Sequence, residues 1–276
     1  MTSKTKSHSA KWAERAIFWE KNAPKGKSVS DDLNQLLIEL TDIKPGDNVL
    51  DIASGSGEPA ISIAFQTGPE GQVTALDAHP EMLAGARKRA EFLNLTNITF
   101  KISRMEKLPF VDSTFDAVTC RFGLMSSDDP LETLRGVRRV LKAGKMAAFM
   151  THGLHERNTI STVLTQVIQD KLVDQNGLAS PTRPLPFSEP ESLKEVFATA
   201  EFRNVGEREI VKTHTCKGGT KFWKSLLERR YGPRLRLLDR AQLIDLDASI
   251  KVAFSPYLKG DHYELLSTDM VGWGTK

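Results

Sequence analysis

The sequence has few cysteines, no long apolar run and almost no excess of charge. Cys120 and Cys216 are its only cysteines, and because they form no CxxC motif, neither a disulfide framework nor a zinc site is indicated. No stretch approaches the roughly 20 apolar residues of a membrane-spanning helix, so stable membrane insertion is not expected. The formal net charge of +3 is mild and argues neither for nor against a nucleic-acid partner.

The N-terminus and the composition indicate a cytoplasmic globular protein. The first residues, MTSKTKSHSAKWAER, are basic but lack the apolar segment of a signal peptide. The chain has 276 residues, of which 39% are hydrophobic and 26% charged, which is enough for one large α/β domain with an ample core.

The stretch at 47–64, DNVLDIASGSGEPAISIA, organises the rest of the chain. Its first apolar residues suit a short buried strand, the small residues at 53–57 suit a tight turn, and Pro59 suits the first turn of a helix. A strand, a glycine turn and a helix N-terminus together present backbone N–H groups to a ligand. We therefore predict a nucleotide-like cofactor here, held by the loop residues Ala53, Ser54, Gly55 and Gly57.

The choice of cofactor depends on two acidic residues. Gly55-x-Gly57-x-x-Ala60 satisfies the dinucleotide fingerprint, so NAD is a rival. However, Asp51 would direct a carboxylate into the site, which repels a phosphate but suits the ammonium group of an amino acid. Asp77 follows a second apolar run and can accept hydrogen bonds from the ribose of any adenosine cofactor. An adenosine that carries an amino acid describes S-adenosylmethionine.

Five segments occur in the order typical of one enzyme superfamily: VLDIASGSGEPAISIA, ALDAHPEML, EKLPFVDSTFDAV, RFGLM and LRGVRRVLKAGKMAAF. In these segments the chain resembles class I S-adenosylmethionine-dependent methyltransferases, and within them most the ubiquinone/menaquinone-biosynthesis C-methyltransferase group and its small-molecule relatives. The resemblance is specific from about Asp47 to His152 and only architectural on either side. It implies an α/β, Rossmann-like fold with a seven-stranded, mostly parallel sheet, helices on both faces and a helical cap.

The expected organisation is a single methyltransferase domain over 1–276. Its parts are an N-terminal helical lid at 1–43, a cofactor-binding core at 44–152, an insertion or cap at 153–190, and a C-terminal part of the sheet with inserted helices at 191–276. The lid helix at 9–22 could instead pack on the domain edge, and the proline-rich segment of the insertion could be a plain linker.

The resemblance also implies residues around the adenine. Ala78 and Met82 match positions that flank the ring in relatives, although core packing is an alternative for Met82. Relatives usually place Asp or Asn where Arg104 stands, and arginine has only donors, so it cannot accept a hydrogen bond from the adenine amino group. Either the backbone of Met105 or the side chain of Glu106 is expected to make that contact.

Two further strand ends carry candidate residues. By resemblance, Arg121 and Phe122 border the methionine moiety and the substrate; Arg121 could pair with the methionine carboxylate, with an acidic substrate or with an unrelated surface acid. A base is needed only where the acceptor must lose a proton, and His152 is the candidate, followed by His155. No metal is required, and no His/Asp/Glu cluster has the spacing of metal ligands.

We therefore predict methyl transfer to carbon or oxygen of a small hydrophobic or aromatic acceptor that is quinone-, polyketide- or terpenoid-like. One alternative is a protein of the same fold that binds S-adenosylmethionine and catalyses a non-methylating reaction such as a cyclisation. An NAD-dependent oxidoreductase is the other, against which stand Asp51 and the lack of a Tyr-x-x-x-Lys motif. The chain has no Asn/Asp-Pro-Pro-Tyr motif, so methylation of nucleic-acid bases is not expected. A homodimer is left open.

Overall fold

The computed structural model describes residues 32–172 and 185–276. The lid helix predicted at 9–22 lies outside the described residues, as does most of the proline-rich segment at 178–187.

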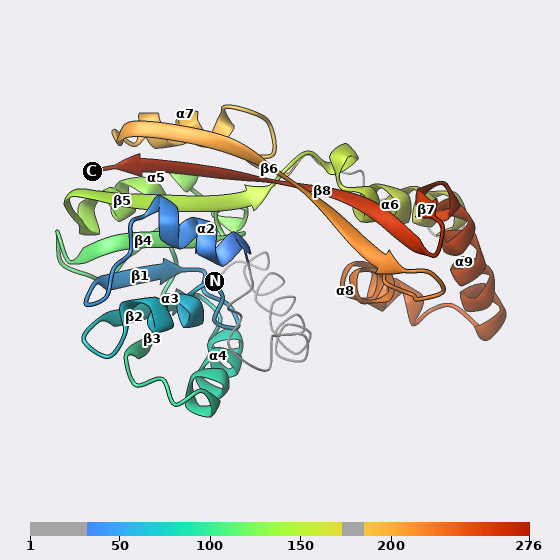
Figure 1. The fold of residues 1–276 in the computed structure, drawn as a ribbon, viewed down its shortest axis with the longest axis horizontal. Helices are drawn as coiled ribbons and strands as arrows, with labels where there is room; N and C mark the ends of the chain where they lie inside the picture. The colour runs from blue at the N-terminus through green and yellow to red at the C-terminus, as the bar shows by residue number, and fades with distance from the viewer. Residues whose placement is uncertain (1–31, 173–184) are drawn as a thin grey trace. The chain divides into compact units, whose positions relative to one another are not determined.

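Strands and helices alternate through the first half of the described chain (Figure 1). They are α2 (Asp32–Leu40), β1 (Asn48–Ile52), α3 (Ala60–Thr67), β2 (Gln72–Asp77), α4 (Pro80–Phe92), β3 (Ile98–Ile102), β4 (Phe115–Arg121), the 3-10 helix η1 (Leu124–Ser126), α5 (Pro130–Val140) and β5 (Leu141–His152). Helix α5 begins where the sequence favours it: Pro130 occupies the first turn, and the Asp129 side chain accepts a hydrogen bond from the N–H of Glu132 (2.9 Å).

The second half contains longer strands separated by groups of helices. They are η2 (His155–Arg157), α6 (Thr159–Leu172), α7 (Ser192–Thr199), β6 (Arg203–Lys217), α8 (Lys224–Leu235), α9 (Arg240–Ala253), η3 (Ser255–Tyr257), β7 (Leu258–Lys259) and β8 (His262–Thr275). A capping box formed by Asp239 and Gln242 fixes the start of α9.

The strands form one eight-stranded sheet in the order β3-β2-β1-β4-β5-β8-β6, with β7 paired to β8. Strands β3, β2, β1, β4 and β5 are parallel neighbours, and β8 runs opposite to β5 (Figure 1). The predicted Rossmann-like, mostly parallel α/β fold is therefore confirmed. The strand count was one too low, because β7 is a two-residue strand that closes an antiparallel turn onto β8 and leaves no pattern in the sequence.

The described residues divide into two compact units. The first comprises 32–151, 190–208 and 270–276, and the second comprises 152–172, 185–189 and 209–269. The boundary after 151 lies close to the predicted end of the cofactor-binding core. The C-terminal part predicted at 191–276 is shared between the two units.

The first unit is built around the parallel strands. Helices α2, α3 and α4 contribute to one apolar core with the inner strands; its buried members include Ile38, Ile63, Ala90, Val49 and Val73. Helix α5 lies behind the sheet in the view of Figure 1, with α2 and α3 in front. Edge-to-face packing of Phe149 on Phe197 (5.7 Å between ring centroids) joins β5 to α7.

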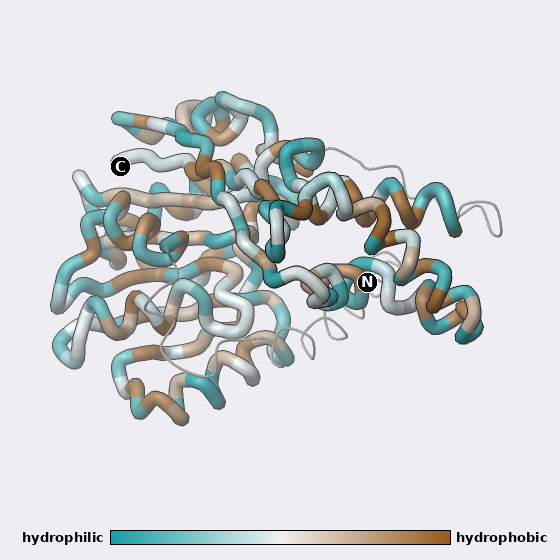
Figure 2. Tube along the Cα trace, turned by 45° about the vertical axis from the view of Figure 1, so that its right-hand side comes forward, coloured by the Kyte–Doolittle hydropathy of each residue, from teal (hydrophilic) through white to brown (hydrophobic). Residues whose placement is uncertain are grey.

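The second unit has an aromatic core of its own. Trp223 stacks on Phe254 at 5.5 Å between centroids, and Phe222 meets the edges of both rings. Helices α6 and α9 add Leu164 and Ile250, which are fully buried. The alternation of hydrophobic and hydrophilic turns along the helices in Figure 2 fits helices that are each buried on one face.

Candidate functional site

The loop between β1 and α3 comes so close to its neighbours that it needs small residues. Gly55 and Gly57 have φ angles of 54° and 98°, a region that favours glycine. A Cβ atom on Gly57 would lie 2.8 Å from Ile61 Cδ1, and one on Gly55 would lie 3.0 Å from Met82 Cε. The loop backbone therefore rests directly on α3 and α4, which fixes the direction of its N–H groups.

Asp51, near the carboxyl end of β1, is a buried acid with an incomplete set of partners. Its Oδ1 accepts a hydrogen bond from Thr119 Oγ1 (2.8 Å), whereas neither its Oδ2 nor the nearby Ser54 Oγ has a hydrogen-bond partner among the described residues. Burial raises the pKa of Asp51 to about 7, against the opposing effects of the hydroxyls of Ser54 and Thr119, the backbone N–H of Ala60 and the charge of Arg121. The Ser54 hydroxyl and the Ala60 N–H are near enough to favour the ionised acid, although neither gives Asp51 Oδ2 a hydrogen bond of full geometry. A buried carboxylate oxygen and a buried hydroxyl thus stand ready for a ligand donor.

Asp77, at the carboxyl end of β2, holds the glycine loop. Its Oδ2 accepts a hydrogen bond from the N–H of Gly55 (3.0 Å), and its Oδ1 accepts one from the N–H of His79 (2.9 Å). A carboxylate oxygen can accept two hydrogen bonds, so Asp77 Oδ2 can still accept one from a ribose hydroxyl. The loop contact was not part of the sequence prediction.

The loop after β4 meets the loop after β1. A Cβ atom on Gly123 would lie 2.4 Å from Ala53 Cβ, so these two loops touch. Phe122 has a φ of 61°, and the Arg121 guanidinium lies 5.6 Å from the centre of its ring. Arg121 Nη1 also donates to Asn34 Oδ1 of α2. The structure thus brings Asp51, the glycine loop, Asp77 and the Arg121–Phe122 pair together at one edge of the sheet.

A nearly buried polar network lies beside this edge. Asn34 Nδ2 donates to Glu58 Oε2 and, at 2.9 Å, to Ser62 Oγ. Glu58 Oε1 pairs with Arg89 Nη2 at 2.6 Å, and Arg89 Nη1 donates to the backbone oxygen of Ser56 (2.7 Å). The network connects α2, the glycine loop and α4.

The predicted adenine-flanking residues differ in their surroundings. Ala78 is exposed just beyond β2, whereas Met82 is buried and packs against Gly55. Met82 therefore packs in the core, as the alternative prediction for this residue proposed, and its side chain contacts the glycine loop at Gly55. A part in flanking the adenine stays a prediction for both residues.

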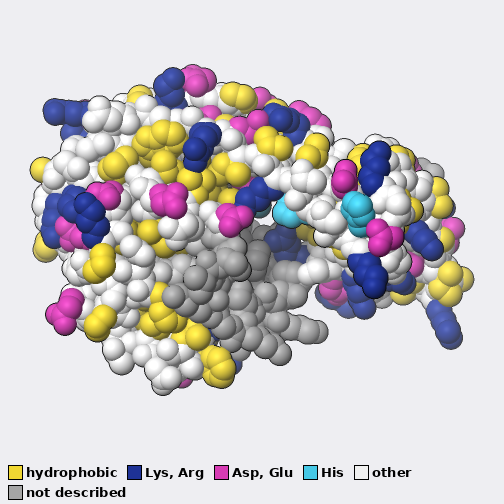
Figure 3. Space-filling view, viewed as in Figure 1, with side chains coloured by type: hydrophobic (Ala, Val, Ile, Leu, Met, Phe, Trp, Pro, Cys, Tyr) yellow, Lys and Arg dark blue, Asp and Glu magenta, His cyan; other side chains and the backbone are white. Residues whose placement is uncertain are grey.

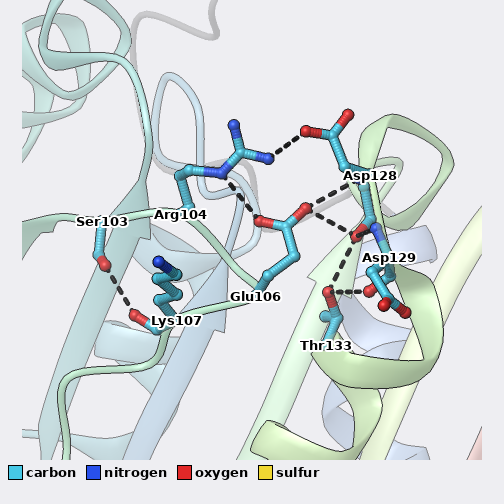
Figure 4. A network of polar contacts seen from close by, with 8 residues as sticks. Ser103, Arg104, Glu106, Lys107, Asp128, Asp129 and Thr133 are labelled. Carbon is cyan, nitrogen blue, oxygen red and sulfur yellow. Dashed lines mark hydrogen bonds and ion pairs between the residues drawn. The ribbon is translucent and has the colours of Figure 1, made fainter. Parts of the chain in front are cut away.

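Arg104 and Glu106 belong to a polar cluster that links the loops after β3 and β4 (Figure 4). Glu106 Oε1 accepts hydrogen bonds from Ser127 Oγ and from the N–H of Asp128, both at 2.9 Å, and its Oε2 pairs with Arg104 Nε at 3.2 Å. Burial alone would raise the pKa of Glu106, but these hydrogen bonds outweigh it and lower the pKa. Arg104 also pairs with Asp128, so its side chain is directed to acidic residues. Met105, between them, is half-buried.

His152 belongs to the second unit, at the end of β5, and has an acidic neighbour there. Its Nδ1 lies 3.1 Å from Asp269 Oδ1 of β8. A carboxylate can only accept, so the proton of a neutral imidazole lies on Nδ1 and leaves Nε2 as an acceptor. Such an arrangement suits a general base.

Comparison with known proteins identifies the family. A family model described as "Methyltransferase domain" matches residues 43–200, which is 158 of the 276 residues. The chain belongs to this methyltransferase family. The family predicted from the five sequence segments is therefore confirmed.

Curated relatives of this family match the chain over part of its length. The demethylmenaquinone methyltransferase of Listeria welshimeri is 38% identical over 111 residues, which cover 40% of this chain and 47% of that protein. The ubiquinone/menaquinone biosynthesis C-methyltransferase UbiE of Teredinibacter turnerae is 41% identical over 108 residues, covering 39% and 43%. The chain thus spans about half the length of the curated relatives it matches.

A solved structure shares the fold of this methyltransferase more widely. Haemonchus contortus phosphoethanolamine N-methyltransferase 2, solved in complex with S-adenosyl-L-methionine, aligns with a TM-score of 0.53 at 19% identity. The alignment covers 89% of this chain and 52% of that one.

Several of the polar residues described above were not predicted from the sequence: Asn34, Glu58, Arg89 and Thr119 in the first unit, and Asp269 in the second. For Asn34 a signal was present, because it shares the buried face of α2 with Leu37 and Ile38. A polar residue three and four positions before buried apolar ones faces the core and needs polar partners there.

The remaining expectations concern cysteines, metals and membranes. Burial raises the pKa of the Cys120 thiol to about 12, which keeps it protonated and unsuited to act as a nucleophile. Among residues 32–172 and 185–276, no three His, Cys, Asp or Glu side chains are grouped so as to hold a metal ion. No helix in the described part of the methyltransferase combines the length and apolar character needed to cross a membrane. Acidic and basic side chains are interspersed on the face seen in Figure 3.

Proposed function

We propose that this chain transfers a methyl group from S-adenosylmethionine to carbon or oxygen of a small hydrophobic or aromatic acceptor. The observation that carries the proposal is the buried Asp51 Oδ2, which has no hydrogen-bond partner among the described residues, as is also true of the Ser54 Oγ near this carboxylate. An ammonium group supplies the donors that both oxygens need, whereas the pyrophosphate of NAD would bring negative charge against a buried acid.

The other predicted residues suit the rest of the cofactor. The Arg121 guanidinium, near enough to lower the pKa of Asp51, suits the methionine carboxylate. Asp77 suits the ribose hydroxyls through its remaining acceptor capacity. Ala78 and Met105 are the proposed adenine contacts, and Glu106 is less suited to this role because both of its oxygens already accept hydrogen bonds.

For methyl transfer the protein mainly has to orient the acceptor toward the methyl group and to exclude water from the site. When bound, S-adenosylmethionine supplies an electrophilic methyl group on a sulfonium that is already a good leaving group. Where the acceptor must lose a proton, we propose that His152 Nε2 accepts it while Asp269 holds the Nδ1 proton. The curated relatives are named for the methylation of quinone precursors, and they are 38–41% identical to this chain over the matched segment. This similarity supports a quinone-like acceptor over the polyketide- and terpenoid-like alternatives.

Calorimetry with S-adenosylmethionine and NADH tests the proposal. We expect S-adenosylmethionine to bind the wild type, NADH to bind far more weakly, and Asp77→Ala to weaken S-adenosylmethionine binding by about 1.5–3 kcal/mol. The matched control is Asp112→Ala, which removes a surface acid from the same unit. Preference for NADH would overturn the cofactor assignment.

Turnover then separates methyl transfer from other chemistry in the same pocket. Formation of S-adenosylhomocysteine with demethylmenaquinol or a simpler naphthoquinol is expected. Conversion of an acceptor without S-adenosylhomocysteine would instead favour the non-methylating alternative, such as a cyclisation.

A further inference from the structure

Asn34 is a polar side chain where the sequence pattern calls for an apolar one. It lies on the buried face of α2, its residue is 1% exposed, and both ends of its amide make hydrogen bonds. Burying an amide is unfavourable unless every polar atom finds a partner. Asn34 meets that condition because Arg121 donates to its oxygen, while Glu58 and Ser62 accept hydrogen bonds from its nitrogen.

The partners allow the amide a single orientation. Arginine has only donors, so Arg121 must meet the oxygen of Asn34. An ionised glutamate has only acceptors, so Glu58 must meet the nitrogen. Glu58 is itself held by Arg89 at 2.6 Å, with both side chains about 90% buried. The Glu58–Arg89 pair therefore holds the amide nitrogen of Asn34, and with it the position of the amide oxygen.

Arg121, the partner of the Asn34 oxygen, lies beside the glycine loop. Cys120 pairs with Ile52 in the sheet, so Arg121 lies level with Ala53, the first residue of the glycine loop. Its guanidinium has five N–H donors in a rigid fork and gives one of them to Asn34. The side chain of an arginine has several rotatable bonds, and one fixed contact at its end selects among them.

We infer that Asn34, held by Glu58, positions the Arg121 guanidinium to recognise the carboxylate of the cofactor's amino-acid end. Asn34 and Glu58 are positioning residues, and Arg121 is the residue that touches the cofactor. This inference rests on the proposed function and assigns it a determinant of specificity: the site distinguishes cofactors that carry a carboxylate from those that do not.

The test compares two ligands that differ only in this group. S-adenosylmethionine and its decarboxylated form both carry the ammonium and the sulfonium. Calorimetry on the full chain should show that the wild type prefers S-adenosylmethionine at least tenfold. Asn34→Leu, which suits a buried helix face, should reduce this preference about tenfold by weakening S-adenosylmethionine alone. Gln35→Leu, at an exposed amide on the same helix, is the control and should keep the preference.

A double-mutant cycle shows whether Asn34 acts through Arg121. Arg121→Met should abolish the preference, and adding Asn34→Leu to it should change nothing further. Equal weakening of both ligands by Asn34→Leu, or an effect that persists in the Arg121→Met background, would overturn the inference. If the wild type binds neither ligand, the proposed function itself fails, which is a separate outcome.

Discussion

At the scale of single residues, Asp51 makes the site depend on pH. Its pKa in the folded chain, about 7, exceeds the ordinary value of 3.8, so the folded state binds this proton more tightly than the unfolded state. Its contribution to stability is therefore fully present below about pH 4, is lost as the pH rises through about 7, and stays constant above. The same ionisation prepares the site for an ammonium group.

Replacing Asp51 with a neutral residue should stabilise the folded chain and weaken the binding of S-adenosylmethionine. Asp51→Asn removes the cost of a buried charge, so above pH 7 we expect the free energy of unfolding to rise by about 2–4 kcal/mol, with no gain near pH 4. S-adenosylmethionine should bind at least tenfold more weakly, because the ammonium loses its ionic partner. Urea denaturation at pH 4, 6 and 8 with calorimetry measures both effects. A variant less stable than the wild type at pH 8 would contradict the buried-charge argument.

His152 and Asp269 make a second prediction at this scale. For an acceptor that must lose a proton, His152→Ala should lower kcat about 10²–10⁴-fold and leave the Kd of S-adenosylmethionine unchanged. Asp269→Asn should also lower kcat, because an amide can donate to Nδ1 and move the imidazole proton to Nε2. Steady-state kinetics across pH, with binding measured separately, checks both variants.

The matched comparison for this pair is His155→Ala, in η2 three residues along the chain. Burial and the charge of Arg230 lower the pKa of His155, which keeps it neutral at pH 7. If His155→Ala lowers kcat and His152→Ala does not, the base has been assigned to the wrong histidine.

At the scale of elements, the turns before and after β1 depend on glycine for two separable reasons. Gly57 and Gly46 both have positive φ angles, but a Cβ atom meets Ile61 only at Gly57 and open space at Gly46. Gly46→Ala should therefore lower the free energy of unfolding by about 1 kcal/mol, from backbone strain alone. Gly57→Ala should lower it by about 2–4 kcal/mol, because crowding is added.

Urea denaturation of the two alanine variants, with binding of S-adenosylmethionine to each, measures this difference. Gly57→Ala should also weaken binding, since the loop must move to relieve the contact with α3. Equal losses of stability in both variants would show that the crowding at Gly57 is relieved without cost.

Elements determined by neighbours in sequence could be predicted well. The β1–loop–α3 unit combines an apolar run, small residues and a helix start within 18 residues, and Asp77 follows a second apolar run. Contacts between distant residues could not be predicted. Asn34 and Arg121 are 87 positions apart, and His152 and Asp269 are 117 apart. No local period encodes such pairs, and only the closure of the sheet brings them together.

At the scale of the molecule, the described residues divide into two compact units, whereas the sequence predicted a single domain with a cap. The apolar spacing of α6, α8 and α9 predicted helices, but spacing alone does not show that their buried faces meet one another around an aromatic cluster. The fold class was predictable because strands and helices alternate through the first unit. The assignment of each half of β6 and β8 to a unit was not, since both strands continue through the division.

A cavity made in the core of one unit should destabilise that unit and leave the other unit protected from hydrogen exchange. Phe254 is fully buried against Trp223 and Phe222, and Phe254→Ala should cost about 3–5 kcal/mol. We expect hydrogen exchange to speed up in α6 and α9 and to stay slow in β1 and β4. Phe149→Ala, in the core of the first unit, is the matched control and should give the reverse pattern. Loss of protection throughout the chain in both variants would show a single cooperative unit.

The fixed direction of the Asn34 amide has a consequence for how this sequence can evolve. Because a donor-only side chain meets one end and an acceptor-only side chain meets the other, a single replacement at position 34, 58 or 121 that changes the donor or acceptor character leaves a partner unsatisfied. Lineages that lose one of these residues should lose or replace the others as well. Homologous sequences should therefore show these three positions inherited as a set, although they lie far apart along the chain.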